Sequence, residues 1–321
     1  MSSSQVTGAG PAGPAPAQLS ETEFRSLYER LRAQVPWGPD DRRGALNYIT
    51  QADVLAACGS VRLGRSVSLA AQVEDWVTPD NPDPAQHKMK GRLGADAGPG
   101  LSFGMDRIAM NIHGNADSHI DALCHVIFDG KLYNGVAAET VTETGADELS
   151  IDLAADGIIG RGVLLDVPRS RGVPWLEPGD HVTREDLLAA ERDQGVRIGR
   201  GDIVLVRVGH RRRRNEQGPW DASEARAGLH PTALPLLAER QVAVLGSDGN
   251  NDTAPSSTDG VDFPVHVLAV NALGLYLMDY LQFGDLSPLC EGEGRWSFLC
   301  VIAPLRLPTG TGSPVNPIAI V

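Results

Sequence analysis

From residue 160 onward, short apolar runs alternate with segments that carry helix signals, and this pattern limits the fold more than any other feature. The runs with the length and composition of buried strands are 162–167, 202–209, 242–248, 275–281 and 296–307. The segments with capping residues, proline starts or glycine stops typical of helices are 183–195, 232–241 and 263–274. Buried strands interleaved with helices are typical of α/β proteins, so we predict an α/β fold.

The N-terminal segment, residues 1–19, is rich in Gly, Ala, Pro and Ser, and we expect a disordered tail there. Its glycines at 8–13 match a GxGxxG spacing, but no strand precedes them and prolines interrupt them, which excludes a dinucleotide fingerprint. Ser20 and Glu23 then form a capping box that predicts a helix start. Since no repeat or linker follows, we expect residues 20–321 to form a single domain.

The net charge and the distribution of apolar residues limit the classes of molecule that the protein is expected to bind. The formal net charge of −13 argues against binding of nucleic-acid phosphates. The one basic run, Arg211–Arg214, is interpreted as a solvated loop. No apolar run approaches the ~20 residues that a membrane span needs. The N-terminus also lacks the apolar core of a secretion signal. We therefore expect a cytoplasmic protein that binds neither membrane nor nucleic acid.

The spacing and surroundings of the cysteines are typical of a protein in a reducing compartment. Four cysteines lie far apart in the sequence and form no CxxC pair. Three of them, Cys58, Cys124 and Cys300, stand among apolar neighbours. We expect these three to be buried free thiols.

The stretch with the clearest chemical content is residues 113–126, HGNADSHIDALCHV. If residues 107–121 form a strand entering a loop, His119 and Asp121 point to the same side, because side chains alternate along a strand. An imidazole nitrogen and a carboxylate oxygen on one side are a natural pair of ligands for Zn²⁺ or Mn²⁺. The sequence thus suggests a metal site.

His125 follows four residues later and is either a third ligand or the base that takes a proton from water. A divalent metal can lower the pKa of a bound water to about 7, where a neutral histidine suits proton transfer. The alternative is that these polar residues cap a helix starting near Ala122, with His125 packed under a loop. His113 alone is then structural. Asp129-Gly130 predicts a tight hairpin that either folds residues 131–134 over the site or is simply a turn.

Three further polar residues lie in apolar surroundings. Asp248 ends a strand, where α/β sites usually lie, and either orients a histidine, holds the substrate or makes an Asx turn. His266 falls in the first turn of an apolar helix and Asp279 lies inside an apolar strand. A buried charge needs a partner, which for Asp279 is a metal or, alternatively, an arginine. Neither Ser nor Cys shows a nucleophile signature.

Residues 118–135, SHIDALCHVIFDGKLYNG, resemble the metal-dependent cyclase family that includes bacterial kynurenine formamidase and isatin hydrolase. Other blocks that resemble the family, in the same order, are WGPDDRRGALNYIT (37–50), GDIVLVRVG (201–209), GSDGNND (246–252), PVHVLAVNALGLYLMDYL (264–281) and PLRLPTGTGSPVNPIA (304–319). The resemblance implies a single swivelling β/β/α domain in a homodimer or homotetramer. It also implies hydrolysis of an amide, cyclic amide or ester with one or two divalent metals.

Compared residue by residue, the resemblance assigns roles to most of the side chains named above. The positions that match metal ligands are His119, Asp121 and His266, and Asp279 stands near a further acidic ligand that is usually Glu. His125 matches the catalytic histidine. Trp37 and Asn47 match residues of the substrate pocket, although Trp37 also fits a plain core position.

The sequence departs from the family at Asn115, which stands where the first histidine ligand is expected. His113 has the same strand parity as His119 and could replace it, and so could Asp117. One metal, two metals or none are therefore all open.

The function that we expect is a metal-dependent hydrolase of a small formamide, lactam or lactone on an aromatic or polyketide-like skeleton. In this interpretation His125 moves the proton to the leaving atom. The first alternative is a true cyclase or dehydratase that uses the same groups. The second is a metal-free protein that binds a small molecule, which Asn115 favours.

Overall fold

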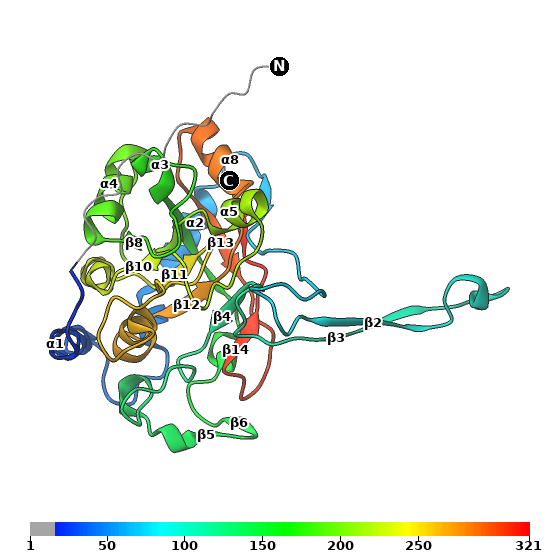
Figure 1. The fold of residues 1–321 in the computed structure, drawn as a ribbon, viewed down its shortest axis with the longest axis horizontal. Coiled ribbons are helices and arrows are strands. Elements are labelled where there is room, and N and C mark those ends of the chain that lie inside the picture. The colour runs from blue at the N-terminus through cyan, green and yellow to red at the C-terminus, as the bar shows by residue number, and fades with distance from the viewer. Residues whose placement is uncertain (1–16) are drawn as a thin grey trace.

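The computed structural model describes residues 17–321, and its centre is a nine-stranded sheet (Figure 1). The strand order is β1-β15-β13-β7-β9-β11-β12-β4-β14. The bounds are β1 Ser66–Ser68, β4 His119–Asp121, β7 Ile158–Asp166, β9 Ile203–Arg207, β11 Val244–Ser247, β12 Tyr276–Asp279, β13 Ser297–Ile302, β14 Gly312–Pro314 and β15 Ile318–Ile320. The four strands β7, β9, β11 and β12 are parallel, and the flanking strands pair antiparallel.

Helices cover this sheet, and three two-stranded ladders lie outside it. The α-helices are α1 Glu21–Arg32, α2 Gln51–Gly59, α3 Val167–Arg171, α4 Arg184–Gln194, α5 His210–Gln217, α6 Leu234–Glu239, α7 Pro264–His266 and α8 Leu286–Glu293. A π-helix, η7 (Val267–Ala272), continues α7, and short 3₁₀ turns are η1 Gly44–Tyr48, η2 Gly94–Ala97, η3 Tyr133–Gly135, η4 Ala138–Thr140, η5 Ile151–Ala154 and η6 Pro231–Ala233. The ladders are β2 (Gln86–Gly91) with β3 (Gly104–Ala109), β5 (Val141–Thr142) with β6 (Gly145–Ala146), and β8 (His181–Val182) with β10 (Gly228–Leu229).

The predicted α/β class is confirmed, and the apolar runs are the strands of the sheet centre. Strands β11 and β12 are buried along their whole length, as expected of parallel strands covered on both faces. The capping box of Ser20 and Glu23 begins α1 as predicted. Thr183 caps α4, and Gly195 ends it in the left-handed conformation.

Several predictions of local structure are corrected. The strand predicted over 107–121 is two separate strands, β3 and β4, joined by residues 110–118, which contain turns and bends. No helix begins near Ala122 in the described chain, so the capping alternative for the histidines is wrong. Residues 1–16 of the predicted tail lie outside the described residues, whereas Leu19 donates its backbone N–H to the Ser257 carbonyl.

The basic run is also corrected, because Arg211–Arg214 lies in helix α5 rather than in a loop. Residues three apart in a helix lie on the same face, so Arg211 and Arg214 both turn inward, where Arg211 is buried and Arg214 bonds to Glu74 and Asp80. Cys58 is exposed near the end of α2, which buries little besides Ala57, while Cys124 and Cys300 are buried as expected.

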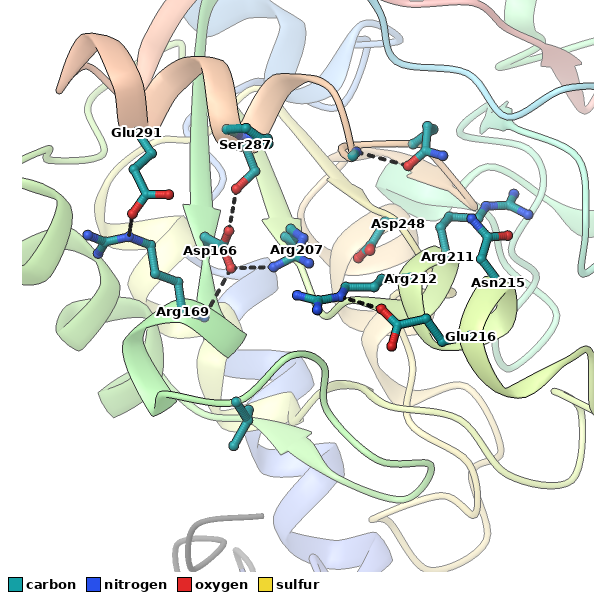
Figure 2. A pocket seen from close by; sticks show the side chains of 14 residues that line it. Asp166, Arg169, Arg207, Arg211, Arg212, Asn215, Glu216, Asp248, Ser287 and Glu291 are labelled. Atoms are coloured by element: carbon teal, nitrogen blue, oxygen red, sulfur yellow. Dashed lines mark hydrogen bonds and ion pairs between the residues drawn. The ribbon is translucent and has the colours of Figure 1, made fainter. Parts of the chain in front are cut away.

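The carboxyl ends of the parallel strands β7, β9 and β11 border a polar cavity of about 540 Å³ (Figure 2). Asp166 at the end of β7 accepts hydrogen bonds from Arg207 Nη1 at 2.7 Å and from Ser287 Oγ at 2.6 Å. Its carboxylate therefore joins β9 and α8 to the end of β7. Within residues 17–321 no helix is long and apolar enough to cross a membrane.

Substitutions at two glycines of β7, Gly160 and Gly162, can test how closely this sheet is packed. A Cβ at Gly162 would lie 2.3 Å from the Phe298 ring, whereas one at Gly160 would meet only ordinary contacts at 3.7 Å or more. We expect Gly162→Ala to lower the free energy of unfolding by about 1–3 kcal/mol through overpacking. The matched variant Gly160→Ala should stay within about 1 kcal/mol of the parent. Urea denaturation of both variants measures the difference, and equal stabilities would contradict the packing described.

Candidate metal centre

Strand β4 places His119 and Asp121 on one side of the sheet, with Ile120 buried in the core on the other. The neighbouring strand β12 pairs antiparallel with β4, and Asp279 stands directly opposite His119. Directly opposed residues of an antiparallel pair point to the same face. The sheet thus gathers the His119, Asp121 and Asp279 side chains at one place, and all three are buried.

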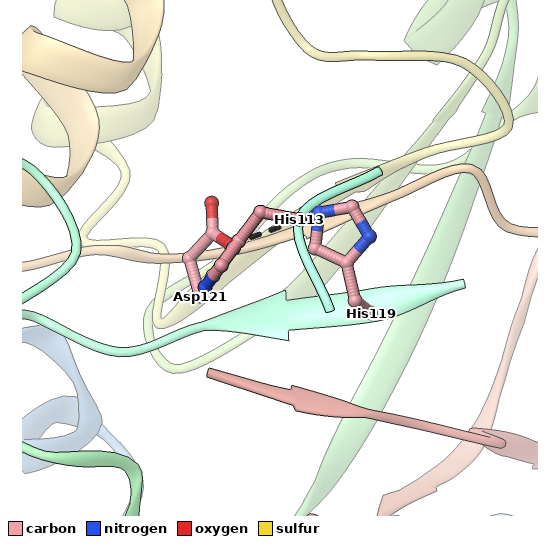
Figure 3. A group of neighbouring side chains, drawn as sticks. All are labelled: His113, His119 and Asp121. Atoms are coloured by element: carbon pink, nitrogen blue, oxygen red, sulfur yellow. Dashed lines mark hydrogen bonds and ion pairs between the residues drawn. The ribbon is translucent and has the colours of Figure 1, made fainter. Parts of the chain in front are cut away.

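A first ligand group consists of His113, His119 and Asp121, whose ligand atoms lie within 4.8 Å of one another (Figure 3). His113 Nδ1 is 2.9 Å and His119 Nε2 is 3.8 Å from Asp121 Oδ1. His119 Nδ1 is hydrogen-bonded to the Asp117 carbonyl oxygen at 2.9 Å. The lone pair of His119 Nε2 is therefore free to face the group. His113, considered structural when taken alone, is a member of the group.

A second ligand group consists of Asp121, His266 and Asp279. His266 Nε2 lies 3.5 Å from Asp121 Oδ2 and 3.4 Å from Asp279 Oδ2. Asp121 therefore belongs to both groups, with Oδ1 toward the first and Oδ2 toward the second. The described residues contain these two His/Asp clusters that could each hold a metal ion.

The electrostatics of the two groups favour a cation. Asp121 Oδ2 is buried and has no hydrogen-bond partner among the described residues, an arrangement that is costly without a bound ligand. Burial alone would raise the pKa of the Asp121 carboxyl, but the neighbouring histidines, His125 foremost, hold it well below its usual value. Burial would also lower the pKa of His266, yet three aspartates raise it well above normal. The residues present fit a divalent metal.

Sequence reasoning missed Asp252, which orients His266. Its Oδ2 lies 2.5 Å from His266 Nδ1 and also accepts the His266 backbone N–H at 2.9 Å. Its other oxygen accepts the Val265 N–H at 2.6 Å. A carboxylate on one ring nitrogen fixes the tautomer, so the other nitrogen is free for a metal. Asp252 closes the GSDGNND block, but nothing in the sequence shows that it reaches a histidine 14 residues later.

Amide groups donate the hydrogen bonds that hold Asp279 in place. Asn250 Nδ2 donates to Asp279 Oδ2 at 2.7 Å, and the Asn251 N–H donates to Oδ1 at 3.0 Å. No arginine pairs with Asp279 among the described residues, so the salt-bridge alternative is not what the structure contains. The carboxylate is held in place by neutral donors, with Oδ2 facing His266 of the second group.

His125 lies beside both groups without belonging to either. Its ring stacks on His113 at 3.7 Å between centroids, and it makes no side-chain hydrogen bond within residues 17–321. Burial lowers the pKa of His125 to about 4, although the charge of Asp121 opposes that shift. A neutral imidazole with both nitrogens free at neutral pH can accept a proton.

The two His/Asp groups do not include Asp117, and Asn115 lines the cavity beside them. Asn115 Oδ1 accepts the Tyr280 hydroxyl hydrogen bond at 3.0 Å. The Asp117 side chain is buried outside both groups, and burial raises its pKa. His113 is the residue that completes the first group.

The two groups open into a cavity of about 490 Å³. Its polar wall carries the histidines, Asn115, Asn250 and Asp279. Its lining also includes the apolar side chains of Ile127, Phe128 and Phe263. The predicted tight turn at Asp129-Gly130 is present, but residues 131–134 do not line the cavity. Phe128, at the base of this turn, does line the cavity.

Three predicted residues are not brought to this cavity. Asp248 lines the cavity of Figure 2 instead, where it accepts the Val208 and Gly209 backbone N–H groups, and burial raises its pKa to about 6. Trp37 packs against Tyr48 with ring centroids 5.1 Å apart. Asn47 donates to Asp41 Oδ1 at 2.7 Å. The structure therefore supplies no contact between these three side chains and the metal centre.

Comparison with known proteins identifies the family. The family model of the putative cyclases matches residues 47–251, and the chain belongs to this family. A crystal structure described as a novel cyclase shares 30% identity with a TM-score of 0.79, covering 92% of this chain and 99% of that one. No curated protein sequence was found to match the chain significantly.

Two isatin hydrolases share the fold at lower identity. Isatin hydrolase A from Labrenzia aggregata, bound to benzyl benzoate, is 24% identical with a TM-score of 0.56, covering 85% of this chain and 99% of that one. Isatin hydrolase A from Ralstonia solanacearum is 24% identical with a TM-score of 0.55, covering 84% and 97%. These matches confirm the predicted cyclase-type architecture.

The role of Asp252 can be tested through metal affinity. Asp252→Asn keeps an oxygen for the backbone N–H groups but loses the charge that fixes the His266 ring. We expect its affinity for Zn²⁺ to fall by roughly 10- to 100-fold, the usual effect of removing such a partner. Calorimetric titration of the metal-free protein measures this, with the exposed Asp221→Asn as the control. Equal affinities in the two variants would contradict the assignment.

Proposed function

We propose that this protein is a metal-dependent hydrolase that opens or cleaves an amide, lactam or lactone bond in a small molecule. The observation that carries the proposal is the carboxylate of Asp121, which is shared by two ligand groups and has a buried oxygen with no hydrogen bond. Beside it lies a cavity that holds the free imidazole of His125. Metal ligands and a proton acceptor that face one cavity are the parts that hydrolysis requires.

His113, His119 and Asp121 would hold one ion, and Asp121, His266 and Asp279 would hold a second. A divalent metal bound there supplies a Lewis acid that polarises a carbonyl and makes a water molecule more acidic. The nitrogen and oxygen donors, with no thiolate among them, suit Zn²⁺ and Mn²⁺ equally.

The protein's own groups supply proton transfer and orientation. His125 takes a proton from the attacking water and returns it to the leaving nitrogen or oxygen. Its stacking on His113 restrains the plane of the ring. Asp252 keeps His266 in one tautomer and Asn250 holds the Asp279 carboxylate. Preorganised groups of this kind lower the cost of reorganisation during the reaction.

The shape of the cavity supports a compact, partly aromatic substrate. Its volume of about 490 Å³ falls within the usual range for small-molecule sites. Ile127, Phe128 and Phe263 form an apolar part of the cavity wall. A ring can pack on that wall while its carbonyl reaches the polar side. The isatin hydrolases with the same fold are named for a substrate of this type.

The proposal is tested by following oxygen from water into product. The purified protein, supplied with Zn²⁺ or Mn²⁺, is incubated in ¹⁸O-water with N-formyl arylamines, aryl lactams and aryl lactones. We expect one ¹⁸O atom in the carboxylate of each product molecule. We expect His125→Asn to lose at least about 100-fold in kcat, the usual contribution of acid–base catalysis, while retaining its metal.

The outcomes separate the competing functions. Ring closure or water loss without ¹⁸O incorporation would indicate a cyclase or dehydratase and contradict hydrolysis. Saturable ligand binding with no turnover, and with the same affinity in a metal-free sample, would indicate a binding protein. The exposed variant His87→Asn serves as the control, because His87 lies on the β2 ladder outside the cavity.

A further inference from the structure

One amide side chain in the wall of the metal-centre cavity has a nitrogen that is not bound within the protein. Asn115 lines this cavity, and its Oδ1 accepts the Tyr280 hydroxyl hydrogen bond at 3.0 Å. Its Nδ2 makes no hydrogen bond with any of residues 17–321. An amide oxygen only accepts and an amide nitrogen only donates. The contact with Tyr280 therefore leaves the NH₂ end of the Asn115 amide for a bound molecule.

Both ends of the other amide in the cavity wall are occupied. Asn250 donates its Nδ2 to Asp279 at 2.7 Å, and its Oδ1 accepts the Asp252 backbone N–H at 2.9 Å. Asp262, which also lines the cavity, is a carboxylate and can only accept. Among the described residues of this cavity wall, Asn115 is thus the amide whose donor end is not already bound.

The backbone segments on both sides of the Asn115–Tyr280 contact are tied together. Arg211 is buried, and its Nη2 donates to the Tyr280 carbonyl at 2.6 Å and also to the Ala116 carbonyl. Ser118 Oγ donates to the same Tyr280 carbonyl. Since Asn115 directly precedes Ala116, these bonds restrict how far the amide can move from Tyr280. A donor that is already in place when a ligand arrives loses less freedom on binding.

The free amide lines the same cavity as the groups that would carry out hydrolysis. His119 and His125 line that cavity too, and the Tyr280 ring lies 6.3 Å from the His119 ring between centroids. Every amide, lactam or lactone has a carbonyl oxygen, which gains negative charge when water attacks the carbonyl carbon. A donor held in place beforehand stabilises that charge without reorganisation. The carbonyl oxygen is therefore the acceptor that the Asn115 amide suits.

We propose that Asn115 is a catalytic residue whose Nδ2 donates a hydrogen bond to the carbonyl oxygen of the substrate. As water adds to the carbonyl carbon, the electron pair of the C=O bond moves to this oxygen, and the amide stabilises the charge. The pair returns to the C=O bond when the leaving atom departs with the proton from His125. Tyr280 is a positioning residue, because it acts through the amide. The proposal rests on the proposed function, since it takes the cavity as the substrate site.

The carbonyl stretching frequency of a bound ketone tests the hydrogen bond without turnover. The probe is indanone, an aryl ketone that has no bond for the proposed hydrolysis to cleave, and it is added to the protein as purified. Since a hydrogen bond weakens the C=O bond, we expect a lower infrared frequency in the parent than in Asn115→Leu, which has a similar size but no donor. Asn111→Leu is the matched control, because Asn111 is exposed in the same loop and does not line the cavity.

The control should have the frequency of the parent. Equal frequencies in the parent and Asn115→Leu, or no binding of the ketone by the parent, would overturn the proposal. A frequency difference together with no hydrolysis by the parent would support the hydrogen bond and contradict the proposed function alone. The spectroscopic result and the hydrolysis result are therefore separable.

The kinetics of hydrolysis test the catalytic role of the same hydrogen bond. We expect Asn115→Leu to lose roughly 10- to 100-fold in kcat, less than the loss of a sole oxyanion donor because a bound metal shares the charge. KM should change by less than about threefold, and the metal content should equal that of the parent. A raised KM with unchanged kcat would overturn the catalytic role, and a loss of metal would make Asn115 a ligand instead.

Two variants of Tyr280 separate orientation from folding. Tyr280→Phe keeps the amide but no longer orients it, so we expect a smaller loss in kcat than in Asn115→Leu. Asn115→Leu/Tyr280→Phe removes both partners and leaves no buried hydroxyl unpaired, which protects the fold. This double variant should lose as much in kcat as Asn115→Leu alone. A double variant as active as the parent would overturn the proposal.

Discussion

The structure of the candidate site depends on the position of one buried carboxylate, that of Asp121. Its two oxygens point to two sets of ligands, and the exposed fraction of the residue is only 1%. A carboxylate so completely removed from water is costly unless positive charge compensates it. Histidines from three separate segments approach Asp121, and the same arrangement leaves one oxygen without a hydrogen bond. The chemistry of the cavity follows from this concentration of negative charge.

The sheet holds Asp121 in place through contacts on both sides of a three-residue strand. Strand β4 lies between β12 and β14, and Ser118 Oγ donates to the Tyr280 carbonyl at 2.6 Å. Arg211 from α5 donates to the same carbonyl at 2.6 Å and also to the Ala116 carbonyl. Tyr280 returns a hydrogen bond to Asn115. A buried arginine thus joins the segments before β4 and after β12, which carry the ligands of both groups.

Local sequence rules predicted the parts of the site that depend on strand parity. His119 and Asp121 were expected on one face because they are two residues apart, and that remains true although β4 is much shorter than predicted. His113, His266 and Asp279 also lie where the ligand hypothesis needs them. The roles of these residues remain predictions until metal binding is measured.

The other parts of the site could not be predicted, because they depend on tertiary contacts that the spacing of residues in the sequence does not encode. Asp252 reaches His266 because the loop after β11 meets the start of α7. Asp248 follows strand β11 directly, at the strand end where α/β proteins usually have their sites, but its side chain lines a different cavity. Four consecutive arginines suggested a solvated loop, but helix α5 turns Arg211 into the interior. In each case, the direction of a side chain was fixed by an element distant in the sequence.

The most direct test of the account is the metal content of the purified protein after loading with Zn²⁺ or Mn²⁺ and removal of the excess. Elemental analysis should be run on the parent, on Asp121→Asn and on Asp279→Asn. We predict one or two equivalents in the parent, none in Asp121→Asn, and at least one retained in Asp279→Asn when the parent holds two. Metal content in Asp121→Asn equal to that of the parent, or no metal in the parent, would contradict the shared-carboxylate site.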